Sequence, residues 1–539
     1  MEPRRHPPTE PGELVLTVDG TEVRVPDRGT SLLDVLRDDL HAHGVKDGCS
    51  PQGQCGCCTV LVDGAPRVAC VTPARRVAGR SVDTVNGLGP EVRDRWSSAL
   101  VATGGSQCGF CTPGVIVRLE GLRRRAGEGP VPSVDEAAES LRANLCRCTG
   151  WRTILEAYEL VIGPDPVAGR ARSLAPAEGD ATRRARLEGR TGQAWGTEVA
   201  LGHGSFAADH APPDALVALP DGRGGWVVGE TAGEVRALAA RVQGRRTTVE
   251  SVPPLDVPNG DWDLVLRTSW VEPAYLEPDA SWCAPGGEPW SPVANGGAFG
   301  GKRSTVVCRA ARELADRHGR PVLAMLTRED VVRLGPKRPP IAAGLRRDGS
   351  GVVRVVRAAG IADRIRSVLP DVEVDEVDVP GPPVSVDLRA AGWAEAAILR
   401  RELAGGDEPI GSPDGGRAWA EVDRGGSIRV RVAAGDPLDV VVLRSYVIGA
   451  AHMALGWVTS ESLAVDASGE VHDLTIRSFG VVRAADTPVI EVEIDRSPEE
   501  VARPGVNGSD AAFAAVAAAV WRHQGRPPDW PTRVPLRPR

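Results

Sequence analysis

The sequence predicts an α+β multidomain protein: a small β-grasp domain over 13–90, a small four-helix domain over 91–165, and a longer α/β region over 187–539. Three observations lead to this prediction. Two strand hairpins enclose a helix near the start of the chain, four short helical segments follow, and strand-like and helix-like segments then alternate to the end. With 539 residues, the chain is long enough for three or four domains.

The two hairpins define the first domain. LVLTVDG and TEVRVP turn at Asp19-Gly20, and TVLVDGAPRVAC turns at Asp63-Gly64. Asp-Gly supplies the positive φ angles that a tight hairpin turn needs. Between the hairpins, Thr30 or Ser31 can cap a helix. The apolar residues of that helix fall on one face: Leu32, Leu33, Val35, Leu36 and Leu40.

Four short helices are predicted next, over 91–103, 113–127, 133–145 and 152–163. Pro113 stands at a first helical position, where proline is tolerated, and Ser133 with Glu136 forms a capping-box pattern. Residues 166–186 are rich in Pro, Ala, Gly and Arg and show no apolar period, which predicts an interdomain linker. Beyond it, strands are predicted within 263–271, 351–358 and 427–433, and helices within 305–319, 389–403 and 511–523.

Composition excludes several classes of protein. Hydrophobic residues make up 42% and charged residues 25%, the balance of a globular protein. The net charge of −8 gives no basic footprint for nucleic acid. We find no run of 18 apolar residues and no apolar N-terminal segment, so we expect no membrane span and a cytoplasmic protein.

The cysteines indicate chemistry. Nine of the 11 fall in the first 148 residues. An odd number without a secretion signal argues against a disulfide framework and for metal or redox work in a reducing compartment.

The first cysteine cluster lies in GCSPQGQCGCCTVLVDGAPRVAC. Cys49, Cys55 and Cys58 give C-x5-C-x2-C, one residue longer than the C-x4-C-x2-C of plant-type [2Fe–2S] sites, and Cys70 on the returning strand supplies a fourth thiol. Cys57 is a fifth, next to Cys58. A structural zinc site or unligated buried thiols are the alternatives at this stage.

The second cluster combines QCGFCTPG with NLCRCTGW. Its thiols are those of Cys108, Cys111, Cys146 and Cys148. A helix beginning near Thr112 favours a negative thiolate at its N-terminus. C-x-C alone is weak, but both pairs following a plant-type loop form a strong signal.

These motifs resemble the iron–sulfur part of the xanthine dehydrogenase (molybdenum hydroxylase) family, over residues 13–165. The resemblance implies a plant-type ferredoxin-like domain and a helical domain, each with one [2Fe–2S] cluster. It assigns Cys49, Cys55, Cys58 and Cys70 to the first cluster. It assigns Cys108, Cys111, Cys146 and Cys148 to the cluster nearer the molybdenum. Gln107 matches a glutamine that approaches the pterin cofactor.

The remaining chain resembles a shortened molybdopterin-binding subunit of that family. GGAFGGK resembles the loop that closes over the cofactor, which implies cofactor-binding roles for Gly296, Gly297, Phe299, Gly300 and Gly301. RAAGWAEAAILRREL resembles the stretch with an active-site arginine, here Arg389. The catalytic glutamate position is Ser509, with Asp510 one position late. Only 17 residues separate Pro278 from Gly296, so much of a catalytic pocket is absent.

Three functions remain open. We favour an electron-transfer component that relays electrons from a molybdenum centre through two [2Fe–2S] clusters to an external acceptor. Its partners would be a molybdenum-binding catalytic subunit and a flavin subunit, quinone or other carrier. The first alternative is a self-contained, compact molybdopterin-dependent hydroxylase with an atypical general base. The second is a non-catalytic assembly or scaffold protein that retains its clusters.

Overall fold

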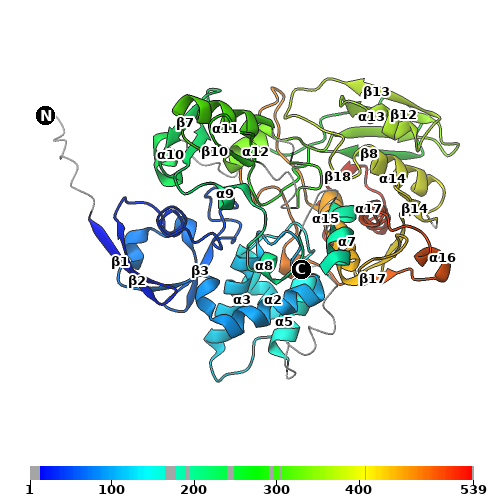
Figure 1. The fold of residues 1–539 in the computed structure, drawn as a ribbon. Coiled ribbons are helices and arrows are strands. Elements are labelled where there is room, and N and C mark those ends of the chain that lie inside the picture. The colour runs from blue at the N-terminus through cyan, green and yellow to red at the C-terminus, as the bar shows by residue number, and fades with distance from the viewer. Residues whose placement is uncertain are drawn as a thin grey trace.

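The computed structural model describes residues 12–163, 178–189, 194–239, 248–290, 297–302, 305–406 and 408–536. The N-terminal sheet and the helices that follow it lie side by side, and the second half covers them from above and from one side (Figure 1). The predicted α+β multidomain architecture is confirmed.

The first domain is a five-stranded sheet in the order β2-β1-β5-β3-β4. Both predicted hairpins are present, and Asp19, Gly20, Asp63 and Gly64 all have positive φ, between 47° and 81°. The predicted helix is short, because α1 continues as a π-helical turn, η1. The elements are β1 (Glu13–Val18), β2 (Thr21–Pro26), α1 (Leu32–Asp34), η1 (Val35–Asp39), β3 (Thr59–Val62), β4 (Ala65–Val68), η2 (Ala69–Val71), η3 (Ala74–Val77) and β5 (Ser81–Asp83).

The second domain contains the four predicted helices. The Ser133–Glu136 capping box forms, and Pro113 lies in the first turn of its helix. In the core, the Trp96 indole donates to the Glu120 carboxylate at 3.1 Å. The elements are η4 (Asn86–Leu88), α2 (Pro90–Thr103), α3 (Thr112–Ala126), α4 (Val134–Ser140), η5 (Leu141–Ala143) and α5 (Arg152–Ile162).

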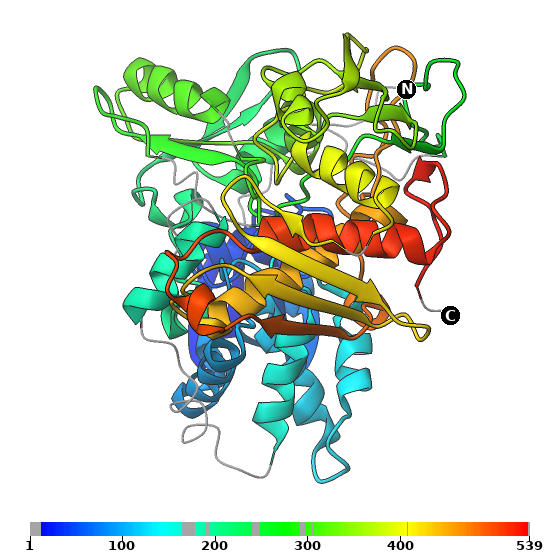
Figure 2. The ribbon, with the colours of Figure 1, turned by 90° about the vertical axis from the view of Figure 1, so that its right-hand side faces the viewer.

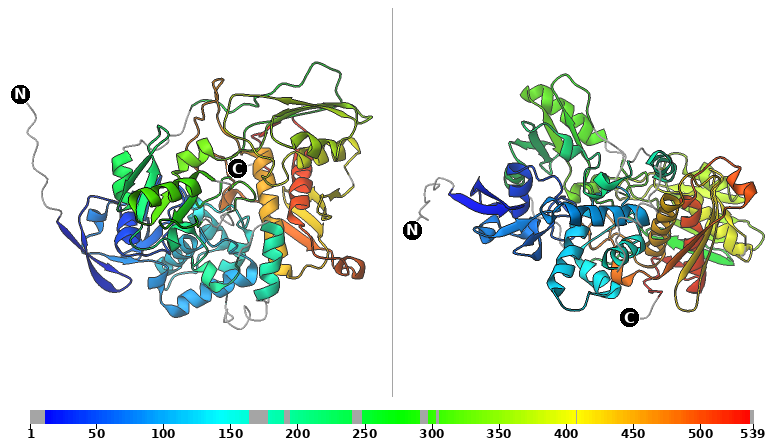
Figure 3. Two further views of the ribbon diagram at one scale, coloured as in Figure 1. Left: turned by 45° about the horizontal axis from the view of Figure 1, so that its top comes forward. Right: turned by 60° about the horizontal axis from the view of Figure 1, so that its bottom comes forward.

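The second half is built on three sheets, ordered β7-β6-β10-β9, β13-β12-β11-β8-β18 and β14-β15-β16-β17. Figures 2 and 3 show them as separate layers, each with helices packed on it. The first contains β6 (Leu216–Pro220), β7 (Trp226–Gly229), β9 (Ala280–Cys283) and β10 (Val322–Met325). The second contains β8 (Leu264–Thr268), β11 (Ile341–Leu345), β12 (Gly351–Val356), β13 (Val372–Val377) and β18 (Asp529–Trp530). The third contains β14 (Ile410–Gly411), β15 (Arg417–Val422), β16 (Ile428–Ala433) and β17 (Ile490–Ile494).

The helices of this half are α8 (Thr197–Ala200), α9 (Ala207–His210), α10 (Ala232–Ala239), α11 (Thr305–His318), α12 (Arg328–Leu334), α13 (Ile361–Arg366), α14 (Trp393–Leu403), α15 (Val440–Thr459), η6 (Ala484–Asp486), α16 (Pro498–Val501) and α17 (Ser509–His523). Helix α15 is long and apolar enough to cross a membrane, yet 83% of its apolar window is buried inside the protein. It packs against α17, so it is a core helix of this half.

One boundary differs from the sequence prediction. The sequence predicts a linker over 166–186. Helix α7 (Glu178–Gly189) includes its residues 178–186, and residues 164–177 lie outside the described part of the chain. The prediction is therefore wrong for 178–186. Arg184 explains why: its buried guanidinium donates to Pro437 O and Val506 O at 2.8 and 2.7 Å, and pairs with Glu188 at 3.0 Å. These tertiary contacts fix a helix that the polar sequence alone does not predict.

Candidate functional site

Five buried thiols gather in the loop between η1 and β3 and at η2. The Cys49 thiol contacts those of Cys55 and Cys70, and the Cys70 thiol also contacts that of Cys58. The Cys57 thiol contacts Cys55. The four thiols predicted to bind the first cluster thus form one continuous group, with Cys57 beside it.

Backbone groups shape the loop around these sulfurs. Gln52 N–H donates to Cys49 Sγ at 3.1 Å, and Cys70 N–H to Cys58 Sγ at 3.4 Å. A Cβ on Gly48 would lie 3.1 Å from the sulfurs of both Cys55 and Cys57, so a side chain there would press against both sulfurs. N–H groups directed at sulfur stabilise negative charge on it, as an iron–sulfur site requires.

The second group of thiols joins the start of α3 to the segment before α5. Cys108 Sγ and Cys148 Sγ lie 3.7 Å apart, and the Cys111 thiol contacts that of Cys146. Contact with Cys111 lowers the pKa of Cys146 to about 6, and Thr149, whose hydroxyl is 3.2 Å from its sulfur, adds to this shift. Two pairs of buried thiols therefore face one another, as two irons with two cysteines each require.

Both groups fit [2Fe–2S] clusters by the chemistry of their donors. All eight thiols are buried and free of disulfides. Unligated thiols explain neither the N–H groups directed at sulfur nor eight cysteines buried as two groups.

The two groups of thiols adjoin. We call them the first centre (Cys49, Cys55, Cys58 and Cys70) and the second centre (Cys108, Cys111, Cys146 and Cys148). Leu145 N–H donates to Cys55 O at 2.9 Å, and Asn144 Nδ2 to Gly56 O at 3.2 Å. Gly56 has φ of 72°, and a Cβ there would lie 2.6 Å from the Asn144 amide. The loop of the first centre is thus tied directly to the segment that leads into Cys146.

Gln107, which the resemblance assigns to the pterin cofactor, lies beside the second centre. Its Nε2 donates to Cys148 O at 3.0 Å and to Ser445 Oγ in α15 at 2.9 Å, while its buried Oε1 has no hydrogen-bond partner among the residues that the structure describes. The amide therefore links the second thiol group to the core helix of the second half.

The glycine-rich loop packs tightly against this centre. Gly296 lies outside the described residues. A Cβ on Gly297, with φ of 74°, would lie 3.0 Å from Cys148 Sγ, and a Cβ on Gly300, with φ of 90°, only 1.7 Å from Asp387 O. A Cβ on Gly301 would approach Pro273 as closely as 2.7 Å. Close approach to protein atoms accounts for these three glycines.

The three predicted catalytic positions are brought together. Arg389 Nε lies 3.0 Å from Asp510 Oδ1, and Arg389 Nη2 lies 2.9 Å from Ser509 Oγ. The guanidinium also stacks on Phe299, 3.9 Å from the ring centroid. All of these groups except Phe299 are fully buried. Asp510 is thus held as the partner of an arginine rather than as a base open to substrate.

These residues leave little space. The cavity that Phe299 and Arg389 border has a volume of about 30 Å³, room for a water molecule or two. Sites for organic cofactors usually take roughly 300–1,000 Å³. The described residues of this chain therefore do not fit a molybdopterin between the glycine-rich loop and Ser509.

Sequence reasoning missed the residues that fix the segments around the thiols and the start of α17. Glu188 in α7 accepts from Gly508 N–H at 3.1 Å and Ser509 N–H at 2.9 Å. Arg147, between two cluster cysteines, forms a buried bidentate pair with Glu461. Arg328 in α12 donates to Gly48 O at 2.7 Å. No local pattern marks these residues, since each acts on a segment far away in sequence.

Two family models match the N-terminal third. The 2Fe-2S iron-sulfur cluster binding domain matches residues 16–76, and the [2Fe-2S] binding domain matches residues 84–159. They cover the two thiol groups described above.

Curated relatives match the same region. The chain is 43% identical over 126 residues to a probable xanthine dehydrogenase subunit from Bacillus subtilis, covering 23% of this chain and 70% of that protein. It is 37% identical over 175 residues to the aldehyde oxidoreductase iron-sulfur-binding subunit PaoA of Escherichia coli, covering 30% of this chain and 76% of that protein.

The fold of the whole chain is similar to that of the aldehyde oxidoreductase from Desulfovibrio gigas. The TM-score is 0.65 at 15% sequence identity, over 94% of this chain and 97% of that one. This likeness shows that the second half shares the fold. With two buried groups of four thiols at the matched positions, the chain belongs to the xanthine dehydrogenase (molybdenum hydroxylase) family as a carrier of its two [2Fe–2S] domains.

Proposed function

We propose that this chain is the electron-transfer component of a molybdenum-hydroxylase-type oxidoreductase whose molybdenum centre is held by a separate catalytic chain. The observation that supports this most directly is a contrast within one molecule. Both thiol groups are complete and buried, whereas the cavity beside Arg389, which is paired with Asp510, has a volume of only about 30 Å³. Reducing conditions such as those of the cytoplasm suit its free thiols.

The proposed route runs from the second centre to the first. The second centre adjoins Gln107 and the second half, and the first adjoins it through Leu145 and Cys55. Oxidation of one substrate molecule releases two electrons, and two [2Fe–2S] clusters accept one electron each. An external carrier, such as a flavin subunit or a quinone, then removes both electrons and regenerates the oxidised clusters.

This chain's own residues would hold and insulate the clusters. Eight thiolates bind iron, and backbone N–H groups at Gln52 and Cys70 stabilise sulfur charge. A compact hydroxylase would instead need a pocket for cofactor and substrate together, and the cavity of about 30 Å³ beside Arg389 is too small for either.

Metal analysis of the protein purified with its native partners tests the proposal. We expect about four irons per chain of this protein, two for each cluster, and molybdenum that follows a separate chain when the subunits are dissociated. Near-stoichiometric molybdenum on this chain alone would support the compact hydroxylase and reject the proposal. Clusters that dithionite reduces but that no acceptor reoxidises in the complex would instead support the non-catalytic scaffold.

A further inference from the structure

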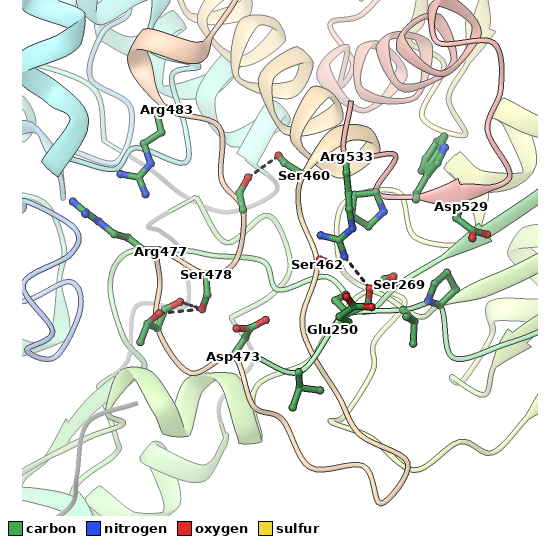
Figure 4. A pocket seen from close by; sticks show the side chains of 18 of the residues that line it. Glu250, Ser269, Ser460, Ser462, Asp473, Arg477, Ser478, Arg483, Asp529 and Arg533 are labelled. Carbon is green, nitrogen blue, oxygen red and sulfur yellow. Dashed lines mark hydrogen bonds between the residues drawn. The ribbon is translucent and has the colours of Figure 1, made fainter. Parts of the chain in front are cut away.

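A large groove lies beside the segment 473–483. Its volume is about 1,040 Å³, above the usual range for ligand sites. One wall is the segment 473–483 between α15 and β17, and the other is formed by 249–253 and the residues around β18 (Figure 4). We call it the arginine groove, after Arg477, Arg483 and Arg533.

The three guanidinium groups of the groove have no carboxylate within ion-pair distance among the residues that the structure describes. They donate to main-chain carbonyls instead. Arg477 Nη2 and Arg483 Nη1 both donate to Arg142 O, at 3.4 and 2.6 Å, and Arg533 Nη2 donates to Ser251 O at 2.8 Å. Most other arginines that line a cavity of this chain are paired; Arg389, for example, holds Asp510.

Arg477 and Arg483 converge on one wall. Figure 4 shows their side chains pointing toward each other, away from the opposite wall with Glu250 and Asp529. Two cations that share a single carbonyl repel each other, and burial together with the Arg477 charge lowers the pKa of Arg483. An anion between them would relieve this repulsion, and the planar guanidinium matches phosphate and carboxylate oxygens.

The acidic groups near the pair do not neutralise it. Asp529 is held by Arg267 through two contacts of 2.7 and 2.8 Å, and Asp473 accepts from Ala464 N–H at 3.1 Å. Exposed Asp486 acts on Arg483 only through space. The wall therefore keeps a net positive charge.

This wall is joined to the first centre. Gln54 Oε1 accepts from Arg477 N–H at 3.2 Å, and Gln52 Nε2 donates to Leu474 O at 2.9 Å. Both glutamines lie between Cys49 and Cys55. The shared acceptor, Arg142 O, belongs to the segment that leads into Cys146. The arginine pair thus lies where the two iron–sulfur domains meet the second half.

We propose that Arg477 and Arg483 form a binding site for a small organic anion carrying phosphate or carboxylate groups. The site is separate from both thiol groups and from the filled pocket at Arg389. Its occupancy would add negative charge beside the loop of the first centre. The proposal does not depend on the direction of electron flow.

Isothermal titration calorimetry on the full-length protein with its clusters tests the site, with inorganic pyrophosphate and citrate as probes. We expect at least one probe to bind, and the double substitution Arg477→Gln/Arg483→Gln to weaken that binding at least tenfold. Tighter binding of pyrophosphate would identify phosphate as the recognised group, and tighter binding of citrate would identify carboxylate.

Two further variants serve as controls. Arg533→Gln changes a cation on the opposite wall and should alter affinity less than twofold. Arg477→Lys/Arg483→Lys keeps the charge and should restore part of the binding. The visible absorption of the clusters reports that each variant is folded. Binding of neither probe, unchanged affinity in the Gln double variant, or an equal loss in Arg533→Gln would overturn the proposal.

Discussion

Arg389 and Asp510 form a buried ion pair, with 3.0 Å between Nε and Oδ1, beside the Phe299 ring of the glycine-rich loop. The two residues come from the loop before α14 and the first turn of α17, so they tie two layers of the second half together. Their role in this chain is structural in the sense that each neutralises the other.

Replacing Arg389 by Ala would leave the Asp510 carboxylate buried without its partner. Removal of one member of a buried pair costs about 3–5 kcal/mol, and we expect the free energy of unfolding to fall by that amount in urea denaturation. Arg429→Ala, at an exposed pair with Glu421 and Glu491, is the control and should cost less than about 1 kcal/mol. If the free energy of unfolding of Arg389→Ala fell by less than about 1 kcal/mol, the ion pair would not stabilise the packing of these layers.

Glu188 fixes the beginning of α17 through two N–H contacts and is itself held by Arg184. Glu188→Ala removes hydrogen bonds to a buried charge, each worth roughly 1.5–3 kcal/mol. We expect a lower melting temperature without loss of cluster absorbance. Glu198→Ala, at an exposed position in the short helix α8, is the comparison. Equal melting temperatures for the two variants would contradict the role given to Glu188.

The buried imidazole of His452 should make the free energy of unfolding depend on pH. Burial, assisted by the Arg147 charge, lowers its pKa from 6.5 to about 3, and its Nε2 lies 3.1 Å from Val482 O. The unfolded chain therefore binds the extra proton, so this contribution is complete above about pH 6.5 and is lost as the pH falls toward 3. The slope is at most about 1.4 kcal/mol per pH unit for this one group.

The variant His452→Gln should show a smaller fall in the free energy of unfolding between neutral pH and about pH 5 than the unmodified protein. Exposed His203→Gln is the matched control and should keep the original slope. An unchanged slope in His452→Gln would mean that the imidazole is already charged in the folded protein.

Substitutions of Cys146 and Cys57 test which thiols are cluster ligands and which only lie beside a cluster. Both thiols are buried, but only Cys146 belongs to a group of four predicted ligands. Cys146→Ala should abolish one of two low-temperature EPR signals of the dithionite-reduced protein and lower its iron content by about half. Cys57→Ala should keep both signals. Loss of a signal in Cys57→Ala would place Cys57 in the first ligand set instead.

The sequence predicted what local chemistry determines. The Asp-Gly turns, the Ser133–Glu136 cap and the spacing of the cysteines each depend on residues close together in the chain, and the structure reproduces the turns and the cap. Family resemblance singled out Arg389 and Ser509 separately, and the structure brings the two side chains into contact.

What the sequence could not predict depends on distant contacts. Helix α7 is polar, and only the burial of Arg184 under the loop at Pro437 explains why it forms. The arginine pair at 477 and 483 becomes recognisable only when both side chains meet at Arg142 O. Spacing along the chain carries no information about such meetings.

Through the hydrogen bond from Arg328 to Gly48 O, the second half supports the loop of the first centre. The Arg328 guanidinium also donates to Tyr275 O and Leu276 O at 2.8 Å. Arg328 therefore connects the loop that carries Cys49 to the main chain of the second half. If the first 165 residues were cut free, this support for the loop of the first centre would be lost. The second half thus forms part of the surroundings of the first centre, and the two parts of the chain depend on each other at this point.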